Sequence, residues 1–347
     1  MSEEAGGVEA PLNRTLEMLG EAFETELRRY VAGVARSGPI PNLHDAMAYA
    51  LGTDIEDPAL RGKRIRPLLC LLTARALGAR SAEAMPFALA IELMHNFALV
   101  HDDMQDGDVM RRGRDAVWVR YGAAHAINIG DYLLVHANRV LADAVGLAPE
   151  TRVRLLALIG SALDHTHVGQ ALDMNARAGR DVSLEDYLRI VREKTGHYLA
   201  APIQGGAIVA GAGEPVLAAI GEMAGLLGPM FQIIDDIIDL TDGKGREAVG
   251  SDIREGKRSY LVAHAAARAA PEERERLFRI LDAPRDQTTL PMIAEAAEIF
   301  ERHGSVAAGR VYCNELYADS RRVLETMPAP LSRALGEVLE MLVRRKH

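Results

Sequence analysis

Four aspartates, Asp102, Asp103, Asp106 and Asp108, lie within seven positions of the sequence, directly after a long apolar run. The apolar periodicity predicts a helix over residues 82–106, so Asp102 and Asp106, four residues apart, share one face of it. Like charges at this spacing repel each other. We therefore expect a cation to occupy that face.

A second acidic cluster with the same DDxxD spacing closes the apolar segment FQIIDDIIDLTD, with Asp235, Asp236, Asp239 and Asp242. Asp235 and Asp239 share a helix face, and Gln232 lies three residues before Asp235. A single cluster is often an exposed helix end, but aspartate within two apolar helices is unfavourable unless it is paired or bound to metal. Carboxylates suit hard cations, and Mg²⁺ binds few of them and completes its shell with substrate phosphates. The two clusters predict a magnesium-dependent diphosphate site.

Basic side chains that could bind a diphosphate directly lie in four other segments. Each segment alone is usually solvated surface, but together with the acidic clusters they favour an anion site. Arginine suits bidentate contact with phosphate, and lysine acts as a point charge. The candidates are Lys63, Arg64 and Arg66 in GKRIRP, Arg111 and Arg112 in MRRGR, Lys194 and Thr195 in REKTGHY, and Lys257 in REGKRSY.

The composition is that of a soluble globular protein, with 48% hydrophobic and 26% charged residues among 347. The net charge of −9 offers no basic field for nucleic acid. Cys70 and Cys313 have no disulfide or metal spacing. The acidic, glycine-rich start does not resemble a signal peptide, and we find no uncharged apolar run of about 18 residues that would predict a transmembrane segment. We expect a cytoplasmic protein.

Helical periodicity extends over nearly the whole chain, and no segment has the pattern of a strand. Because no linker divides the chain, we expect one all-helical domain over 13–347 after a disordered lead-in over 1–12. Loops rich in glycine and charge are expected at 107–121 and 241–257. The predicted helices are 13–35, 41–50, 63–78, 82–106, 122–146, 149–179, 184–211, 215–241, 258–269, 272–283, 289–303, 304–326 and 330–345.

Taken together, the motifs resemble those of the trans-isoprenyl diphosphate synthases, the polyprenyl synthetase family. The matching stretches follow the family's order from about residue 60 to 257: GKRIRP, ELMHNFALVHDDMQDGDVMRRG, GQALDM, KTG, FQIIDDIIDLTD and GSDIREGK. The resemblance implies an all-α orthogonal bundle of long helices around a deep central apolar cavity, the isoprenoid synthase fold, and usually a homodimer. It also implies head-to-tail condensation of isopentenyl diphosphate with an allylic diphosphate.

The resemblance assigns a role to each matching residue. It implies about three Mg²⁺ ions per site, with Asp102, Asp106 and Asp235 as principal ligands, Asp103 and Asp239 in support, and Asp236 completing the acidic set. Gln170 and Asp173 would face the same cavity. Isopentenyl diphosphate would be bound by Lys63, Arg66, His95 and Arg112. The allylic diphosphate or its metals would be contacted by Arg111, Lys194, Thr195, Gln232 and Lys257.

Three positions depart from the family's pattern. Arg61 stands where glycine is frequent, and Ser259 where threonine is common. Glu247 falls where many members have a lysine, and Lys244 is displaced from that position by three residues. One contact to the allylic diphosphate is therefore open at the level of sequence.

Product length should depend on the depth of the cavity along the first aspartate helix. Phe97 lies five residues before Asp102, about 7–8 Å along the axis, with Ala98 beside it and Met94 a turn farther on. An aromatic here, with no insertion in DDMQD, resembles the pattern of geranylgeranyl (C20) diphosphate synthases; C15 and C25–C30 products stay open. A terpene cyclase would not need the isopentenyl diphosphate residues, and a non-catalytic regulatory subunit would be expected to lack one aspartate cluster.

Overall fold

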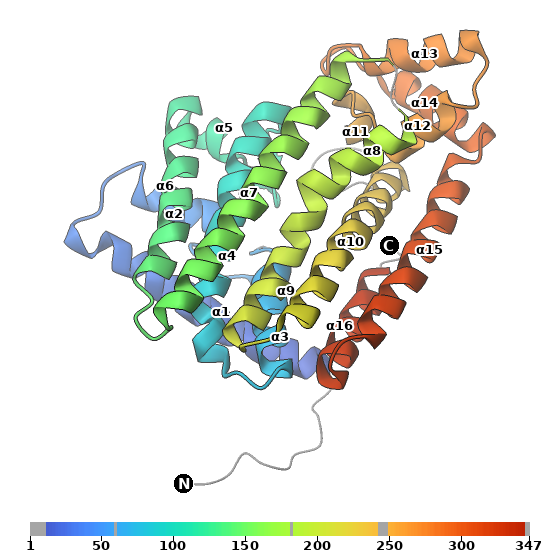
Figure 1. The fold of residues 1–347 in the computed structure, drawn as a ribbon. Coiled ribbons are helices and arrows are strands. Elements are labelled where there is room, and N and C mark those ends of the chain that lie inside the picture. The colour runs from blue at the N-terminus through green and yellow to red at the C-terminus, as the bar shows by residue number, and fades with distance from the viewer. Residues whose placement is uncertain (1–11, 59–60, 181–182, 242–248, 344–347) are drawn as a thin grey trace.

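The computed structural model describes residues 12–58, 61–180, 183–241 and 249–343, and it is almost entirely helical (Figure 1). The prediction of an all-α fold is therefore confirmed. The α-helices are α1 Leu12–Val34, α2 His44–Leu51, α3 Ile65–Ala76, α4 Ser81–Asp106, α5 Val117–Tyr121, α6 Ala123–Ala142, α7 Pro149–Ala178, α8 Leu184–Val191, α9 His197–Val209, α10 Glu214–Thr241, α11 Ser251–Arg254, α12 Tyr260–Ala266, α13 Pro271–Leu281, α14 Leu290–Arg302, α15 Ser305–Glu325 and α16 Ala329–Val343.

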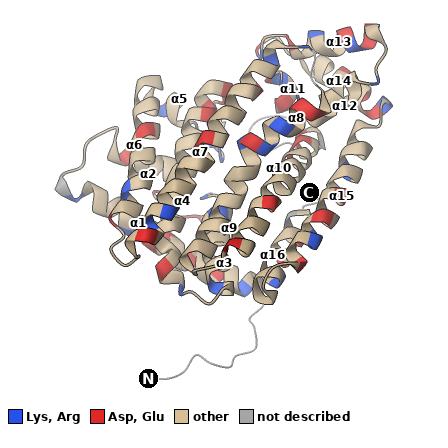
Figure 2. Ribbon diagram, viewed as in Figure 1, with Lys and Arg blue, Asp and Glu red and all other residues tan. Residues whose placement is uncertain are grey.

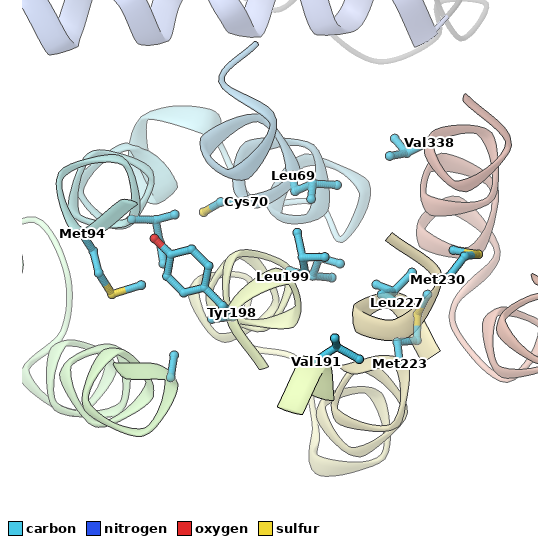
Figure 3. Packing of buried hydrophobic residues seen from close by; sticks show 14 of the residues in the cluster. Leu69, Cys70, Met94, Val191, Tyr198, Leu199, Met223, Leu227, Met230 and Val338 are labelled. Carbon is cyan, nitrogen blue, oxygen red and sulfur yellow. The ribbon is translucent and has the colours of Figure 1, made fainter. Parts of the chain in front are cut away.

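The long helices pack side by side around α4 and α10. Helix α4 contacts α3 and α6, and α10 contacts α9 and α15, so that α4, α7, α9, α10 and α15 form the body of the bundle (Figure 1). Met94 of α4 and Tyr198 of α9 lie on one side of α9, while Leu199 of α9 and Leu227 of α10 lie on another (Figure 3). The apolar residues of α4 are buried around much of its circumference, as expected of a central helix.

Two core helices are long and apolar enough, by length and composition, to cross a membrane. They are Ser81–Asp106, with 67% of its most apolar window buried, and Glu214–Leu240, with 44% buried. The search for uncharged apolar runs in the sequence analysis had found no such segment. Core helices of soluble proteins pass the same test, so these helices are weak evidence for a membrane span.

A β-hairpin lies where the sequence analysis predicted only a loop, and the prediction that the chain has no strand is wrong at this point. β1 (Met110–Arg111) pairs antiparallel with β2 (Arg114–Asp115). The two turn residues, Arg112 and Gly113, have φ values of +55° and +73°. Two consecutive residues with positive φ are typical of a tight hairpin turn whose twist matches the paired strands. Strands of two residues are too short to produce a periodic pattern in the sequence.

The helix predicted over 184–211 is interrupted by a π-helical turn at Arg192–Gly196, between α8 and α9. Such turns frequently occur at functional sites, because the extra residue changes the direction of the side chains that follow. This turn carries Lys194 and Thr195. Short helices α5 and α11 also lie within the segments predicted as loops.

Candidate active site

The two aspartate clusters meet at one pocket, although more than a hundred residues separate them in the sequence. Asp102 and Asp106 reach it from the end of α4, and Asp235 reaches it from α10. Acidic and basic residues gather near α8 and α11 (Figure 2). The other predicted residues that line the pocket are Asp173, Asp236, Lys194, Thr195, Gln232 and Lys257.

The aspartates of α4 divide between two environments. Asp102 accepts a hydrogen bond from Gln170 Nε2 at 3.0 Å, and Asp106 Oδ1 lies 2.8 Å from Arg177 Nη1. Asp103, only 3% exposed, instead accepts a hydrogen bond from Arg111 Nε at 2.8 Å. Residues four apart share a helix face whereas adjacent residues do not, which explains why Asp103 turns away from its two neighbours.

Helix α7 places a carboxylate, Asp173, and a cation, Arg177, against this cluster, and the π-helical turn adds Lys194. Asp173 Oδ2 lies 2.9 Å from Lys194 Nζ and 3.2 Å from Arg177 Nη2, and Lys194 Nζ lies 3.9 Å from Asp102 Oδ1. Burial tends to raise the pKa of Asp173, but Lys194 and Arg177 offset this, so the pKa lies below its usual value. Likewise burial tends to lower the pKa of Lys194, while Asp102 and Asp173 raise it overall. Asp173, Lys194 and Arg177 are therefore all charged at neutral pH.

The sequence analysis missed Arg177, which pairs with both Asp106 and Asp173. The sequence does contain a pattern that could have identified Arg177. Gln170, Asp173 and Arg177 are spaced three and four residues apart, so they share one helix face. Only the tertiary packing shows that this face is turned toward α4.

The second cluster is divided in a similar way. Both oxygens of Asp236 are engaged, by Tyr187 Oη at 2.9 Å and by Gln232 Nε2 at 3.0 Å. Asp239, 1% exposed, accepts hydrogen bonds from Ser251 Oγ at 2.5 Å and from the backbone N–H of Asp252 at 3.0 Å. Asp236 and Asp239 hold neighbouring segments in place, and Asp236 also lines the pocket together with Asp235.

Lys257 approaches the same pocket from the segment after α11. Its Nζ atom lies 3.0 Å from Asp252 Oδ1 and 2.6 Å from Glu255 Oε2. The side chain of Glu255 is fully buried, and this burial raises its pKa even though Lys257 acts to lower it. Asp242, Lys244 and Glu247 lie outside the described residues, so the question of the displaced lysine is not tested.

A second group of cations gathers near the start of α3. Arg66 Nη1 lies 3.3 Å from His95 Nε2, and the Arg66 guanidinium stacks over the Tyr198 ring at 4.7 Å. Burial, followed by the charges of Arg66 and Arg112, holds the pKa of His95 well below its usual value. His95 is therefore neutral, and because arginine can only donate, Nε2 accepts and Nδ1 carries the proton.

Arg112 reaches this group across the loop before α3. A Cβ atom on Gly62, whose φ is +92°, would lie 2.7 Å from the Arg112 guanidinium carbon, so both the backbone conformation and this close approach favour glycine. Burial lowers the pKa of both Arg66 and Arg112, which shows that the carboxylates around them do not compensate for their desolvation. Lys63 is exposed on the same loop. Such a group is suited to bind an anion.

Arg64, from the same basic motif, has a structural role instead. It is 7% exposed, and it pairs with Glu24 at 2.6 Å and with Glu92 at 2.5 Å. Its backbone has a φ of +46°, in the left-handed region, directly before α3. Arg64 therefore fixes the loop that presents Lys63 and Arg66.

An apolar cavity adjoins the acidic pocket, and Asp235 lines both. Side chains from α3, α9, α10 and α16 form its wall, among them Leu69, Leu199, Leu227 and Val338 (Figure 3). The predicted product-length residues of α4 line neither cavity. Met94 and Phe97 are buried, Ala98 is half-buried, and Phe97 packs against the rings of His101 and His167.

The donor set in the acidic pocket fits magnesium. The oxygens come from carboxylates on three helices, as hard cations prefer. The side-chain oxygen of Gln170 is buried beside Asp102 and accepts no hydrogen bond within the described part of the chain. No thiolate lines this pocket, and neither does an imidazole. The residues present therefore suit Mg²⁺ better than a soft transition metal.

Comparisons with known proteins agree with this chemistry. The sequence model of the family described as Polyprenyl synthetase matches residues 51–299. The chain is 35% identical to a short chain isoprenyl diphosphate synthase of Methanothermobacter thermautotrophicus, over 82% of this chain and 87% of the relative. It is 36% identical to a geranylfarnesyl diphosphate synthase of Aeropyrum pernix, over 81% and 88%.

A solved structure has the same fold. The geranylgeranyl pyrophosphate synthetase of Pyrococcus horikoshii Ot3 superposes with a TM-score of 0.82 at 28% sequence identity, covering 95% of this chain and 99% of that one. The family match over more than half of the chain, the relatives above 30% identity and the shared fold lead to one conclusion: this chain belongs to the polyprenyl synthetase family of prenyltransferases.

Proposed function

We propose that this protein catalyses the Mg²⁺-dependent, head-to-tail condensation of isopentenyl diphosphate with allylic diphosphates, giving a trans-prenyl diphosphate. The observation that carries the proposal is the meeting of Asp102, Asp106 and Asp235 at one pocket with Lys194 and Lys257. An apolar cavity lies directly beside this pocket. This combination suits a substrate with a charged diphosphate end and a hydrocarbon tail.

Asp102, Asp106 and Asp235 would hold about three Mg²⁺ ions, which withdraw charge from the allylic diphosphate when bound. Lys194 and Lys257 would contact the diphosphate and meet the negative charge that develops on its oxygens as it leaves. Thr195 and Gln232 would orient it within the same pocket. The apolar surroundings would keep water away from the allylic cation that remains when the carbon–oxygen bond to the diphosphate breaks. The isopentenyl double bond would attack this cation, and the departing diphosphate would accept the proton that the adduct then loses.

Arg66, Arg112, His95 and Lys63 would bind the diphosphate of isopentenyl diphosphate. Neutral His95 donates through Nδ1–H rather than accepting a proton, because Arg66 occupies Nε2. A positioning role for His95 therefore fits better than a role as general base. Arg111, which is bonded to Asp103, would orient that carboxylate at the edge of the allylic site.

We propose a C20 product, geranylgeranyl diphosphate, with Phe97 as the floor that limits chain growth. The Pyrococcus horikoshii protein carries this activity in its name, whereas the Aeropyrum pernix relative is named for a C25 product. A longer chain would enter either the packed region around Phe97, which would have to open, or the apolar cavity lined by Leu227. Only product analysis separates them, and C15 and C25–C30 products remain its alternative outcomes.

We further propose a single catalytic domain over 13–347 that forms a homodimer in the cytoplasm. Exposed apolar residues on α6 and α7 support pairing through these helices, because contact with a second copy would remove their side chains from water. The exposed residues are Ile127 and Val135 on α6 and Val153 and Val168 on α7. Light scattering of the purified chain would give the mass of a dimer; a monomer would refute this part.

The decisive experiment incubates the purified protein with Mg²⁺, isopentenyl diphosphate and each of the C5, C10 and C15 allylic primers, and then measures product length. We expect C20 as the longest main product, and no product with chelator. Asp235→Asn should abolish turnover, while Asp286→Asn, at a position that lines neither cavity, serves as the matched control. Hydrocarbon formed from the allylic diphosphate alone would favour a terpene cyclase instead, and no turnover at all would favour a regulatory subunit.

A further inference from the structure

Outside the acidic pocket, three side chains with metal-binding atoms converge where α7 meets the π-helical turn. His165 comes from α7, Glu193 from the turn and His197 from the first position of α9. One ligand atom from each lies within 4.8 Å of the other two. His165 Nδ1 is 2.6 Å from Glu193 Oε2, and the two imidazole rings are stacked with centroids 3.7 Å apart. All three are half-buried.

We propose that His165, Glu193 and His197 form a binding site for a divalent transition-metal ion such as Zn²⁺, separate from the magnesium site. Two imidazoles and one carboxylate are the ligand set that borderline metals such as zinc prefer and that magnesium does not. The three groups leave a fourth position for water, as in zinc sites with three protein ligands.

Two adjustments would complete the geometry. Metal–ligand bonds of about 2.1 Å place tetrahedral ligand atoms about 3.4 Å apart, so His165 Nδ1 and Glu193 Oε2, now 2.6 Å apart, would separate and exchange their hydrogen bond for bonds to the metal. His197 must rotate out of the ring stack to complete the set, which its partial exposure permits.

An ion at this site would fasten α7 to the turn that carries Lys194 and Thr195. Gly169 of α7 already lies against the Lys194 backbone, and Lys194 pairs with Asp173 of the same helix. A metal ligated by residues on both sides of Lys194 would therefore restrict movement of this lysine relative to α7. The site thus couples a second kind of metal to the rigidity of the diphosphate pocket.

The test uses the full chain without an affinity tag and with excess Mg²⁺, which saturates the aspartate clusters. Co²⁺ serves as the probe, because imidazole ligation gives a visible absorption band; Zn²⁺ is then added in competition. We expect one Co²⁺ ion to bind per chain, and we expect its binding to raise the melting temperature of the protein. His165→Gln and His197→Gln should each lower the affinity for Co²⁺ by roughly 10–100-fold or more. Loss of a residue that only hydrogen-bonds to a metal ligand already lowers metal affinity by this factor.

His125→Gln, which alters an exposed histidine of α6, is the matched control and should bind as the wild type does. The proposal is overturned if the wild type shows no such band, or if both His165→Gln and His197→Gln retain it. Because the readouts are absorption and melting temperature in the absence of substrate, the outcome is independent of the proposed prenyl transfer.

Discussion

Replacing Gly169 with alanine should disable the active site while leaving the protein folded. A Cβ atom on this residue of α7 would lie 2.2 Å from the backbone nitrogen of Lys194 and 2.5 Å from its Cα. Relief of this overlap to ordinary contact near 3.4 Å requires the turn to move by about 1.2 Å. Neighbouring backbone cannot yield as a flexible side chain can, so Lys194 and Thr195 move with the turn.

The two consequences of this change differ in size. Overpacking costs about 1–3 kcal/mol, and the higher helix propensity of alanine returns about 1 kcal/mol. The free energy of unfolding should therefore fall by about 0–2 kcal/mol. A misplacement of about 1 Å in a catalytic site can reduce turnover by about 100-fold. We expect kcat/KM to fall by about that factor.

Gly160→Ala on the same helix is the matched control, because its added Cβ has no neighbour within 4 Å beyond the adjacent residues and the nearby backbone of its own helix. This variant should keep full activity and gain up to about 1 kcal/mol of stability. Initial rates with saturating Mg²⁺, together with thermal unfolding, measure both effects. If folded Gly169→Ala keeps the activity of Gly160→Ala, the placement of Lys194 against α7 does not matter for turnover, and this reasoning is wrong.

Three other changes test separate parts of the structure. Phe97→Ala should lengthen the main product, as chromatography of the dephosphorylated products would show; an unchanged distribution removes Phe97 as the floor. Tyr187→Phe deprives Asp236 of a buried hydrogen bond and should lower the free energy of unfolding by about 1–3 kcal/mol; unaltered denaturation would contradict this. The pKa of His95 is lowered in the folded state, so the unfolded state binds more protons below pH ~6.5 and stability falls as pH decreases. Wild type should lose up to about 1.4 kcal/mol per pH unit more than His95→Gln, and equal slopes would refute a buried neutral His95.

The long helices were predictable from sequence because each has a repeated apolar pattern that its neighbours satisfy. Helix α4 was predicted over 82–106 and is found at Ser81–Asp106. The hairpin around Arg112 and the π-helical turn were not predictable in this way. Both are short irregular segments that local sequence preferences do not specify. Contacts with distant residues stabilise them, such as the contact of Arg112 with the loop at Gly62.

The site was predictable as a set of residue types but not as a set of contacts. Spacing placed Asp102 and Asp106 on one face, and the structure directs that face into the pocket. Spacing could not show that Asp236 accepts a hydrogen bond from Tyr187, which is distant in sequence. Nor could it show that Asp239 binds the turn at 250–252, which lies across a loop. For Arg64 the sequence predicted a role that the structure does not support. Its motif indicated an anion site, whereas its charge is neutralised by ion pairs with Glu92 and Glu24.

The two proposed anion sites differ in electrostatic balance, and we expect this difference to make the allylic diphosphate depend on metal more than isopentenyl diphosphate does. In the acidic pocket, Asp102, Asp106 and Asp173 lie beside Lys194 and Arg177, so a diphosphate that enters there also meets carboxylates. We expect these carboxylates to repel the anion unless divalent ions enter with it. Around His95, by contrast, Arg66 and Arg112 are half-buried beside a neutral ring, and burial lowers the pKa of both guanidinium groups, so a diphosphate would supply the negative charge that they lack. The proposed function therefore predicts that the two sites distinguish chemically similar diphosphate groups by whether metal must accompany them.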